Sequence, residues 1–293
     1  MLRYFGQLLK FKLSITVVFS AMIGYLLGFD QFNLQHFIYL TIGGFFVTGS
    51  ANSFNQILEK EKDKLMDRTA LRPLPQEKLT ILQAFIFAFI LGILGLFLLN
   101  KINPQGSFYG LMSKSSLFGL VSIFLYVLSY TPLKRVSTIS IFVGAIPGAI
   151  PFLLGYVAAT DDFGLAAGVL FAIQFLWQFP HFISISWVLD EEYKKAGFKM
   201  LFGGEKDRYP ALISVVTSLL MTCVSIMPYF YITDLSLSFF SCIVVFCLGI
   251  WFSFQSVKLY KNLDDNSAKQ LMLSSFFYLP VMQLVFVLDR LLC

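Results

Sequence analysis

The chain has 293 residues, of which 57% are apolar, 17% aromatic and only 13% charged. This composition excludes an ordinary soluble domain and indicates an integral membrane protein. The net charge of +5 does not indicate a nucleic-acid-binding protein, because the sequence offers no soluble face of any size on which basic residues could gather.

Nine long stretches of the chain contain no Asp, Glu, Lys or Arg. Each is 17 to 28 residues long, and a helix of about 20 residues spans a hydrocarbon core of about 30 Å. They lack the alternating polarity of β-barrel strands, which run for about 10 residues. The stretches are 13–29, 31–58, 79–100, 115–133, 136–160, 163–189, 209–233, 235–257 and 270–288. We therefore predict an all-α integral membrane protein, a single domain over residues 1–293 with nine transmembrane helices.

The basic residues are distributed unevenly between the two sides that nine spans would create. Nineteen of the 22 Lys and Arg residues lie in the N-terminal segment and the even-numbered loops, and the other side holds only Lys101, Lys114 and Arg290. Basic residues concentrate on the cytoplasmic side of a membrane. The N-terminus is therefore predicted to be cytoplasmic and the C-terminus to lie on the opposite side. No cleavable signal or transit peptide is evident, which favours a bacterial cytoplasmic (inner) membrane.

The loop after the second span carries acids first and bases second. Asn55, Glu59 and Asp63 stand at i, i+4 and i+8, so three oxygen ligands share one face of a helix end. Arg68 and Arg72 follow before two prolines stop the helix. This arrangement indicates a place to hold a magnesium ion and a phosphorylated ligand.

The polar face of this helix end continues into the membrane, because Asn52 extends the stripe of Asn55 and Glu59. Polar groups at that depth cost free energy unless they face a cavity or partners, so the stripe predicts a central cavity between the helices. The alternation of Lys60 and Lys62 with acids also fits a solvated, salt-bridged helix extension. The buried stripe argues against that simpler interpretation.

The sixth span carries a second polar stripe. Gln174, Gln178 and His181 recur at i, i+4 and i+7, with Trp177 beside them. A buried histidine is usually part of a hydrogen-bonded structure, but one on a polar stripe inside a charge-free span is also a functional candidate. The residues alone leave both interpretations open.

The loop after the sixth span repeats the order of acid before base, with acids at 190–192 followed by Lys194. More than half of all charged residues lie in 59–78 and 190–208. If these two loops face each other, they form one polar mouth through which the cavity opens to the cytoplasmic side.

Two further bases, Lys134 and Arg135, follow Pro132 at the cytoplasmic end of the fourth span. They can serve as a topology anchor or as a clamp for a phosphate group. The residues alone do not decide between these roles.

These residue types suit a reaction in which diphosphate is the leaving group. Mg²⁺ takes oxygen ligands, typically one or two carboxylates together with substrate phosphates. A metal and neighbouring bases stabilise the negative charge that develops on a departing diphosphate. The carbocation left behind needs an apolar, water-poor pocket, which 34 Phe and 13 Tyr residues can supply. A membrane transporter would instead line a pathway with the two polar stripes, but the polar residues cluster at one membrane face.

Three stretches of the chain resemble the signatures of the intramembrane prenyltransferase superfamily, which includes 4-hydroxybenzoate polyprenyltransferase. Their form is similar to that of its haem-modifying branch, the protohaem IX farnesyltransferases or haem O synthases. The resemblance covers residues from about 10 to 290. The stretches are Asn55-x3-Glu59-x3-Asp63 with Met66-x-Arg68-Thr69-x2-Arg72-Pro73-Leu74, then Tyr130-Thr131-x-Leu133-Lys134-Arg135, and Trp177-Gln178-x-Pro180-His181-Phe182 leading to Tyr193-x2-Ala196-Gly197-Phe198-x-Met200-Leu201.

The resemblance implies a role for each candidate residue. The residues implied to bind the metal are Asn55, Glu59, Asp63 and Glu192. Those implied to bind the diphosphate are Arg68, Arg72, Lys134, Arg135 and Lys194. Those implied to contact haem are Trp177, Gln178 and His181, with His181 as an iron ligand or a proton-handling group. The catalytic residues implied are Asn55, Glu59, Asp63, Arg68, Arg72 and His181.

The reaction that the resemblance implies begins with ionisation of farnesyl diphosphate, helped by Mg²⁺. A vinyl group of haem B captures the farnesyl cation, and water completes a hydroxyethylfarnesyl side chain, which gives haem O. The implied partners are farnesyl diphosphate, haem B and membrane lipids, with haem A synthase or a terminal oxidase assembly as the recipient of the product. The alternative within enzymes is prenylation of an aromatic acid in quinone biosynthesis, but the stretch around His181 favours haem.

Two positions depart from the pattern of many superfamily members. Gln56 stands where an Asp often follows the motif asparagine, and Ala196 stands where a second Asp often follows Tyr193. The sequence therefore does not decide which acid of the second loop binds the metal. Glu192 is the best match, with Glu191 and Asp190 as the other candidates.

Overall fold

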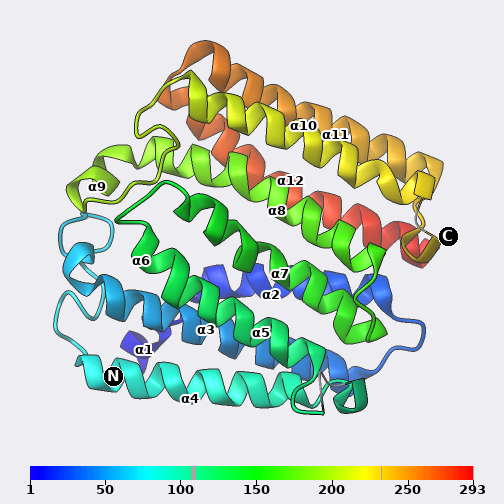
Figure 1. Cartoon of the computed structure of the whole chain (residues 1–293), viewed down its shortest axis with the longest axis horizontal. Helices are drawn as coiled ribbons and strands as arrows, with labels where there is room; N and C mark the ends of the chain where they lie inside the picture. Colours follow the sequence, from blue (N-terminus) through cyan, green and yellow to red (C-terminus); the bar gives the residue numbers. More distant parts are fainter. Residues whose placement is uncertain (107–109, 232, 293) are drawn as a thin grey trace.

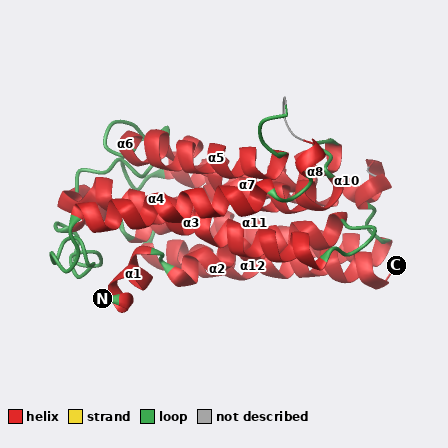
Figure 2. Cartoon of the chain, turned by 90° about the horizontal axis from the view of Figure 1, so that it is seen from below, coloured by secondary structure: helices red, strands yellow, loops and turns green. Residues whose placement is uncertain are grey.

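The computed structural model describes residues 1–106, 110–231 and 233–292, and this part of the chain is helical with no β-strand. The predicted all-α class is therefore confirmed. The long helices lie alongside one another, and the two chain termini lie at opposite ends of the bundle (Figures 1 and 2). The helices are α1 (Leu2–Leu8), α2 (Phe11–Gly28), α3 (Leu34–Asp63), α4 (Ile81–Asn100), α5 (Lys114–Phe124), the π-helical η2 (Leu125–Tyr130), α6 (Thr131–Leu133), α7 (Ser140–Thr160), α8 (Leu165–Val188), α9 (Asp190–Lys195), α10 (Arg208–Tyr231), α11 (Phe239–Asn262) and α12 (Asp265–Leu292), with short 3₁₀ turns η1 (Pro104–Gly106) and η3 (Thr233–Leu235).

Eight helical segments of the described residues are long and apolar enough to cross a membrane. Lys114–Leu133, which joins α5, η2 and α6, counts as one of them. The α3 helix is longer than any of the eight but is not among them, because its second half carries a buried polar stripe. The predicted count of nine spans is therefore not confirmed, and the deviation falls on the span that carries the candidate site.

Helix α7 lies at the centre of the bundle and packs against α2 and α8. A Cβ atom added at Gly155 of α7 would lie 1.9 Å from the Ala21 carbonyl oxygen of α2. In return, a Cβ at Gly24 of α2 would lie 2.2 Å from the Phe152 carbonyl oxygen. Glycine at both positions lets the two backbones touch, which fixes one wall of the interior.

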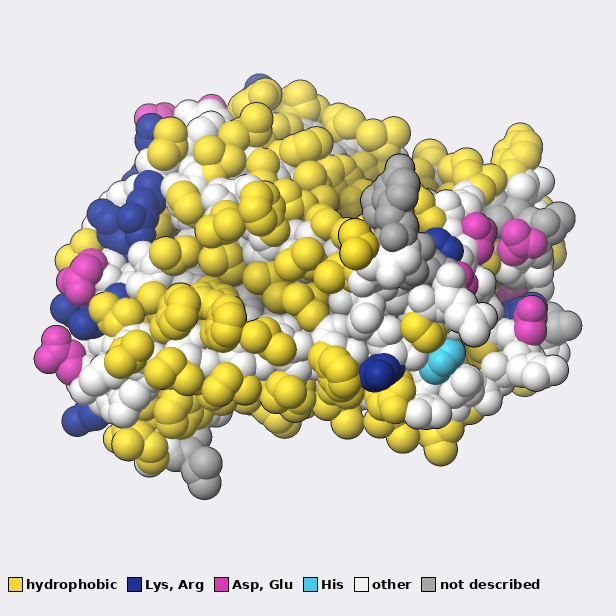
Figure 3. Space-filling view, turned by 60° about the horizontal axis from the view of Figure 1, so that its bottom comes forward, with side chains coloured by type: hydrophobic (Ala, Val, Ile, Leu, Met, Phe, Trp, Pro, Cys, Tyr) yellow, Lys and Arg dark blue, Asp and Glu magenta, His cyan; other side chains and the backbone are white. Residues whose placement is uncertain are grey.

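The main hydrophobic core joins α7 and α8 to the last three helices, and α3 packs against α4 on the other side of α7. Hydrophobic side chains cover the middle of the molecule in the space-filling view, whereas Lys and Arg side chains gather toward the left end, where α9 lies in Figure 1 (Figure 3). This distribution suits a bundle whose middle faces lipid and whose ends face water.

Candidate active site

The polar stripe on α3 is buried as the sequence predicted. Asn52, Asn55, Gln56, Glu59 and Asp63 are each no more than 4% exposed. Helix spacing puts them on one face, and that face turns toward the interior of the bundle rather than toward lipid. Buried polar groups need partners, so the neighbours of this stripe define the site.

Asn55 is held from two sides. Its Oδ1 accepts a hydrogen bond from Lys10 Nζ at 3.1 Å, and its Nδ2 donates to Thr131 Oγ1 at 3.1 Å. The Thr131 hydroxyl in turn donates to the Tyr126 carbonyl oxygen across the wide π-helical turn of η2. Such a turn is often found at functional sites, and here it brings the end of the fourth span against α3.

Glu59 and Asp63 are each paired with a base from another segment. Lys134 Nζ, which follows α6, forms an ion pair with Glu59 Oε1. Arg72 Nη1 donates to Asp63 Oδ2 at 2.8 Å. Both carboxylates and Lys134 are buried, so these ion pairs are shielded from solvent.

Lys10 is a site residue that the sequence analysis missed. It precedes α2 with a φ of 47°, and its side chain reaches inward to Asn55. Burial, followed by the positive charge of Arg72, lowers the pKa of the Lys10 ammonium group to about 7, although the charge of Glu59 opposes this shift. A lysine just before a first span is also typical of a topology anchor, so the sequence carried no signal that separated the two roles.

The two charged loops meet, which is the condition that the sequence analysis set for one polar mouth. Lys195 Nζ lies 3.2 Å from Asp67 Oδ2 of the first loop and 3.0 Å from Glu192 Oε1 of the second. The Lys199 amide also donates to the Lys134 carbonyl oxygen. A small hydrophobic core beneath them takes residues from both loops and from the fourth span: Met66, Tyr130, Ala196, Phe198 and Met200.

The three acids of the second loop have different surroundings. Asp190 Oδ2 pairs with Lys194 Nζ at 2.8 Å, and Glu191 is exposed. Glu192 is partly buried, and its Oε2 atom is buried without a hydrogen-bond partner in the described part of the chain. The geometry therefore favours Glu192 among the three candidates for a metal ligand.

Three of the predicted diphosphate-binding bases lie toward the solvent. Arg68 is exposed, Arg135 is exposed and donates to the Leu58 carbonyl oxygen at 2.7 Å, and Lys194 pairs with Asp190. Among the predicted bases, Arg72 and Lys134 are thus the two paired directly with the buried acids of α3. The assignment of the other three stays a prediction.

The donor set fits a divalent cation. Asp63 Oδ1 and Glu192 Oε2, one from each loop, are buried oxygens that accept no hydrogen bond from the described residues. Over those same residues, no three His, Cys, Asp or Glu side chains form a group that would hold a metal ion by themselves. Magnesium sites of phosphate-transferring enzymes are completed by substrate oxygens and need only one or two carboxylates, so the two observations agree.

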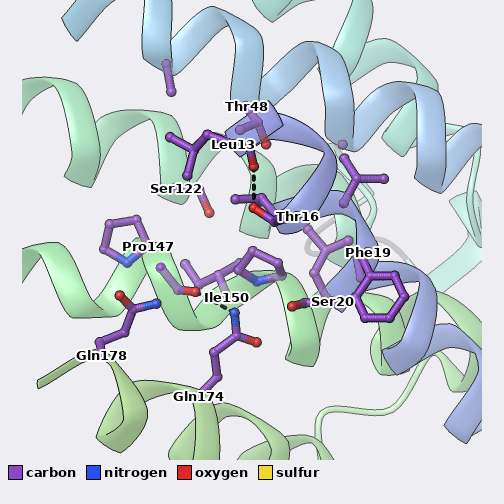
Figure 4. Close-up of a pocket in the computed structure, with 18 of the residues that line it drawn as sticks. Leu13, Thr16, Phe19, Ser20, Thr48, Ser122, Pro147, Ile150, Gln174 and Gln178 are labelled. Atoms are coloured by element: carbon purple, nitrogen blue, oxygen red, sulfur yellow. Dashed lines mark hydrogen bonds between the residues drawn. The ribbon is translucent and has the colours of Figure 1, made fainter. Parts of the chain in front are cut away.

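A cavity of about 570 Å³ lies between the helices next to this polar cluster, and Asn52 is the residue of the α3 stripe that lines it. The cavity is lined by α2, α3, α4, α5, η2, α7, α8 and α12, mostly with apolar side chains. Figure 4 shows Gln174 and Gln178 of α8 near Pro147 and Ile150 of α7. Tyr126 and Tyr130 also line the cavity, and the Lys134 ammonium group lies 4.7 Å from the centre of the Tyr130 ring.

The predicted stripe of the sixth span faces the same cavity. Trp177, Gln178 and His181 all line it. The rings of Trp177 and His181 stack with centroids 4.4 Å apart, and Trp177 Nε1 donates to the Ser275 carbonyl oxygen of α12. The structure therefore brings the stripe of the sixth span and Asn52 of the α3 stripe to one cavity, whereas Asn55, Glu59 and Asp63 do not line it.

The model of the UbiA prenyltransferase family matches residues 17–279, which is most of the chain. The chain belongs to this family. The superfamily predicted from the three stretches is thereby confirmed, and this UbiA protein is a membrane prenyltransferase.

Curated relatives are similar along nearly the whole of this UbiA chain. The protoheme IX farnesyltransferase of Flavobacterium psychrophilum is 49% identical over 292 residues, which covers 98% of this chain and 94% of the relative. The protein of the same name from Flavobacterium johnsoniae is 44% identical with the same coverage. The human mitochondrial protoheme IX farnesyltransferase is 31% identical over 96% of this chain and 60% of its own length. The similarity to the haem-modifying branch is thus confirmed.

Solved structures share the fold of this UbiA chain. Digeranylgeranylglyceryl phosphate synthase superimposes with a TM-score of 0.79 at 22% identity over 98% of both chains. A UbiA homolog from Archaeoglobus fulgidus, described as bound to DMAPP and Mg²⁺, gives a TM-score of 0.72 at 15% identity over 99% of this chain and all of that one. The helical arrangement is therefore the UbiA fold.

Proposed function

We propose that this chain transfers the farnesyl group of farnesyl diphosphate to a vinyl group of haem B. The C1–O bond of farnesyl diphosphate breaks, and C1 bonds to the terminal vinyl carbon of the porphyrin. The inner vinyl carbon then takes a water oxygen and one proton of that water is released, which leaves a hydroxyethylfarnesyl side chain. The products are haem O and inorganic diphosphate.

One observation carries this proposal: a buried cluster of acids and bases lies beside an apolar cavity lined by His181 and Trp177, and Tyr130 of the cavity wall contacts Lys134 of the cluster. A polar end suits the diphosphate, and an apolar interior suits an isoprenoid chain and a porphyrin face. The names of the relatives, which are 43–49% identical over nearly the full chain, support the same donor and acceptor.

The basic side chains of the site prepare the diphosphate to leave. Lys10, Arg72 and Lys134 are already directed at Asn55, Asp63 and Glu59. These bases neutralise the phosphate oxygens and stabilise the charge that develops as the C1–O bond breaks.

Four side chains of the two loops would hold a magnesium ion at this end of the cavity. Bound Mg²⁺ supplies further stabilisation of the departing diphosphate. The first ligands in this proposal are Asp63 and Glu192, whose buried oxygens have no hydrogen-bond partner among the described residues, and Asn55 and Glu59 are the further oxygen donors that the resemblance implies.

The cavity wall protects the farnesyl cation until the vinyl group captures it. Tyr126 and Tyr130 line the cavity on the fourth span, whose end carries Lys134 beside the polar cluster, and their rings lie 5.3 Å apart. Aromatic faces stabilise a nearby cation, and apolar side chains exclude water that would quench it. The amide groups of Gln174 and Gln178 are the polar groups of α8 that could hold the single water needed later.

The location and the partners complete the proposal. The basic residues gather at the loop end that contains the site, so this end faces the cytoplasm of a bacterial inner membrane, with the N-terminus on the same side. Farnesyl diphosphate then reaches the site from the cytoplasmic side, and haem O passes to haem A synthase or to an assembling terminal oxidase.

The test is a product assay with purified protein. We expect haem B, farnesyl diphosphate and Mg²⁺ to yield a new haem whose mass equals haem B plus a farnesyl group and a hydroxyl group. Chelation of Mg²⁺ should abolish the product. If haem B stays unmodified while 4-hydroxybenzoate or another aromatic acid becomes prenylated, the proposed acceptor is wrong.

Variants of the first loop connect this activity to the site. Asp63→Ala and Arg72→Ala are each expected to abolish transfer and leave the protein inserted and folded, because each breaks the buried pair that faces the diphosphate. Glu61→Ala is the matched control, since Glu61 lies on the same helix but its side chain is 73% exposed and pairs only with Lys64. Full activity of either site variant would contradict the assignment.

A further inference from the structure

The His181 ring is fixed in place by residues from two helices. Trp177, one turn earlier on α8, stacks on it with an interplanar angle of 17°. Phe276 of α12 packs edge-on, with centroids 5.1 Å apart and an angle of 83°. On α12 as well, Ser275 Oγ lies 2.8 Å from His181 Nδ1. The imidazole therefore has one ring orientation and one defined partner for Nδ1.

The surroundings of Ser275 decide which ring nitrogen carries the proton. Ser275 Oγ lies 2.6 Å from the Met272 carbonyl oxygen. Two oxygens so close together need a hydrogen between them, and a carbonyl has none to give, so the serine hydroxyl donates to Met272. The same hydroxyl has no second hydrogen for His181. Nδ1 must therefore donate to Oγ, and in the neutral imidazole Nε2 is left with its lone pair.

The Nε2 atom makes no hydrogen bond to the described residues, and its ring lines the cavity. None of the residues that line this cavity is Asp, Glu, Lys or Arg. An imidazolium formed there would have no carboxylate beside it, and an unpaired charge in apolar surroundings is costly. A lone pair that binds a metal creates no such charge on the ring, so the site favours a metal ligand over a proton acceptor.

We propose that Ser275 is a positioning residue that holds His181 as the Nδ1-protonated tautomer, so that Nε2 binds the iron of the haem substrate. The inference rests on the proposed function, because it requires haem in this cavity. A hydrogen bond from the second nitrogen of a metal-binding histidine orients the ring and raises its basicity. Ser275 acts only through His181 and does not itself line the cavity.

The test compares two porphyrins in the full-length protein. Haem B offers iron to Nε2, whereas metal-free protoporphyrin IX has nearly the same shape and no iron. Ser275→Ala is expected to weaken haem B binding by roughly 10- to 100-fold, the usual effect of losing such a hydrogen bond, and to remove the absorption spectrum of histidine-ligated haem. Protoporphyrin IX binding should not change. Ser274→Ala is the matched control, because Ser274 is the neighbouring serine on α12, is also buried, and its side chain makes no hydrogen bond to the described residues.

His181→Ala is also expected to weaken the binding of haem B and to leave the binding of protoporphyrin IX unchanged. Added imidazole should restore the spectrum of ligated haem. Unchanged haem affinity and spectrum in Ser275→Ala would overturn the inference. An equal loss of both porphyrins would also overturn it, because Ser275 would then act through packing alone. If the unaltered protein binds neither porphyrin, the proposed function fails, and that result is distinct from the other two.

Discussion

Lys10 shows most clearly what single residues contribute to this site. Three bases from three separate segments approach three positions of one helix face, and Lys10 supplies the contact to Asn55. The acids of α3 were predictable because their spacing puts them on one face. The partner of Asn55 was not, because a lone lysine 45 positions earlier carries no periodicity that connects it to α3.

We predict that Lys10→Met raises the KM for farnesyl diphosphate by roughly 10- to 100-fold. This change corresponds to the free energy of one hydrogen bond that involves a charged group. Methionine keeps an unbranched stem and removes only the ammonium group. Lys12→Met is the control, since Lys12 lies two residues later and is exposed. Steady-state kinetics at fixed haem B would measure the effect, and equal KM values for the two variants would exclude Lys10 from the diphosphate site.

The acid of the second loop is tested by a pair of neutralising changes. We expect Glu192→Gln to raise the Mg²⁺ concentration needed for half-maximal activity by at least about tenfold, because a buried carboxylate oxygen without a partner is lost. Glu191→Gln should leave the Mg²⁺ dependence unchanged, since Glu191 is exposed. The reverse pattern would assign the metal to Glu191, a choice that the motif alone left open.

At the scale of elements, the contact between α2 and α7 supports one wall of the cavity. The backbones touch at Gly24 and Gly155, which leaves no room for a side chain. The polar stripe of α3 and its burial followed from helix periodicity. The π-helical turn of η2 did not, because its widening depends on how Thr131 and Tyr126 meet α3, and local sequence carries no sign of that contact.

Gly155→Ala is expected to destabilise the protein by about 3 kcal/mol, the upper end of the usual cost of overpacking. The neighbour at 1.9 Å is backbone, which cannot move aside as a flexible side chain can. Gly168→Ala on α8 is the control, because a Cβ there meets nothing within 4 Å, and it should be neutral or stabilise by about 0.5–1 kcal/mol. Thermal unfolding in detergent would compare them, and equal stability would show that α2 and α7 are not in close contact.

At the scale of the whole molecule, the fold class was predictable, whereas the meeting of the two charged loops was only a condition that the sequence could state. Charge-free stretches of membrane length define the helices, and over half of the charge lies in two loops on one side. The count of nine spans was not secure for a physical reason. The helix that carries the site has buried polar residues where the other spans have apolar ones. The composition of α3 alone therefore does not identify it as a membrane span.

The proposed chemistry depends on the convergence of these loops. Lys195 links Asp67 to Glu192, and the shared core that contains Met66 and Tyr130 lies below. The first loop supplies the buried carboxylates of Glu59 and Asp63, and the second loop adds the partly buried Glu192. The loops lie beside an apolar cavity, so in the proposed reaction charge separation begins next to the cavity and the cation is captured inside it.

The most direct test of this account is an experimental structure with Mn²⁺ in place of Mg²⁺ and a non-reactive thio analogue of farnesyl diphosphate, with the metal located by its anomalous scattering. We predict one or more Mn²⁺ ions between Asp63 and Glu192, a diphosphate in contact with Lys10, Arg72 and Lys134, and an isoprenoid chain that enters the cavity past Tyr126. A metal or a diphosphate bound away from the two loops, or a chain that lies outside the cavity, would contradict it.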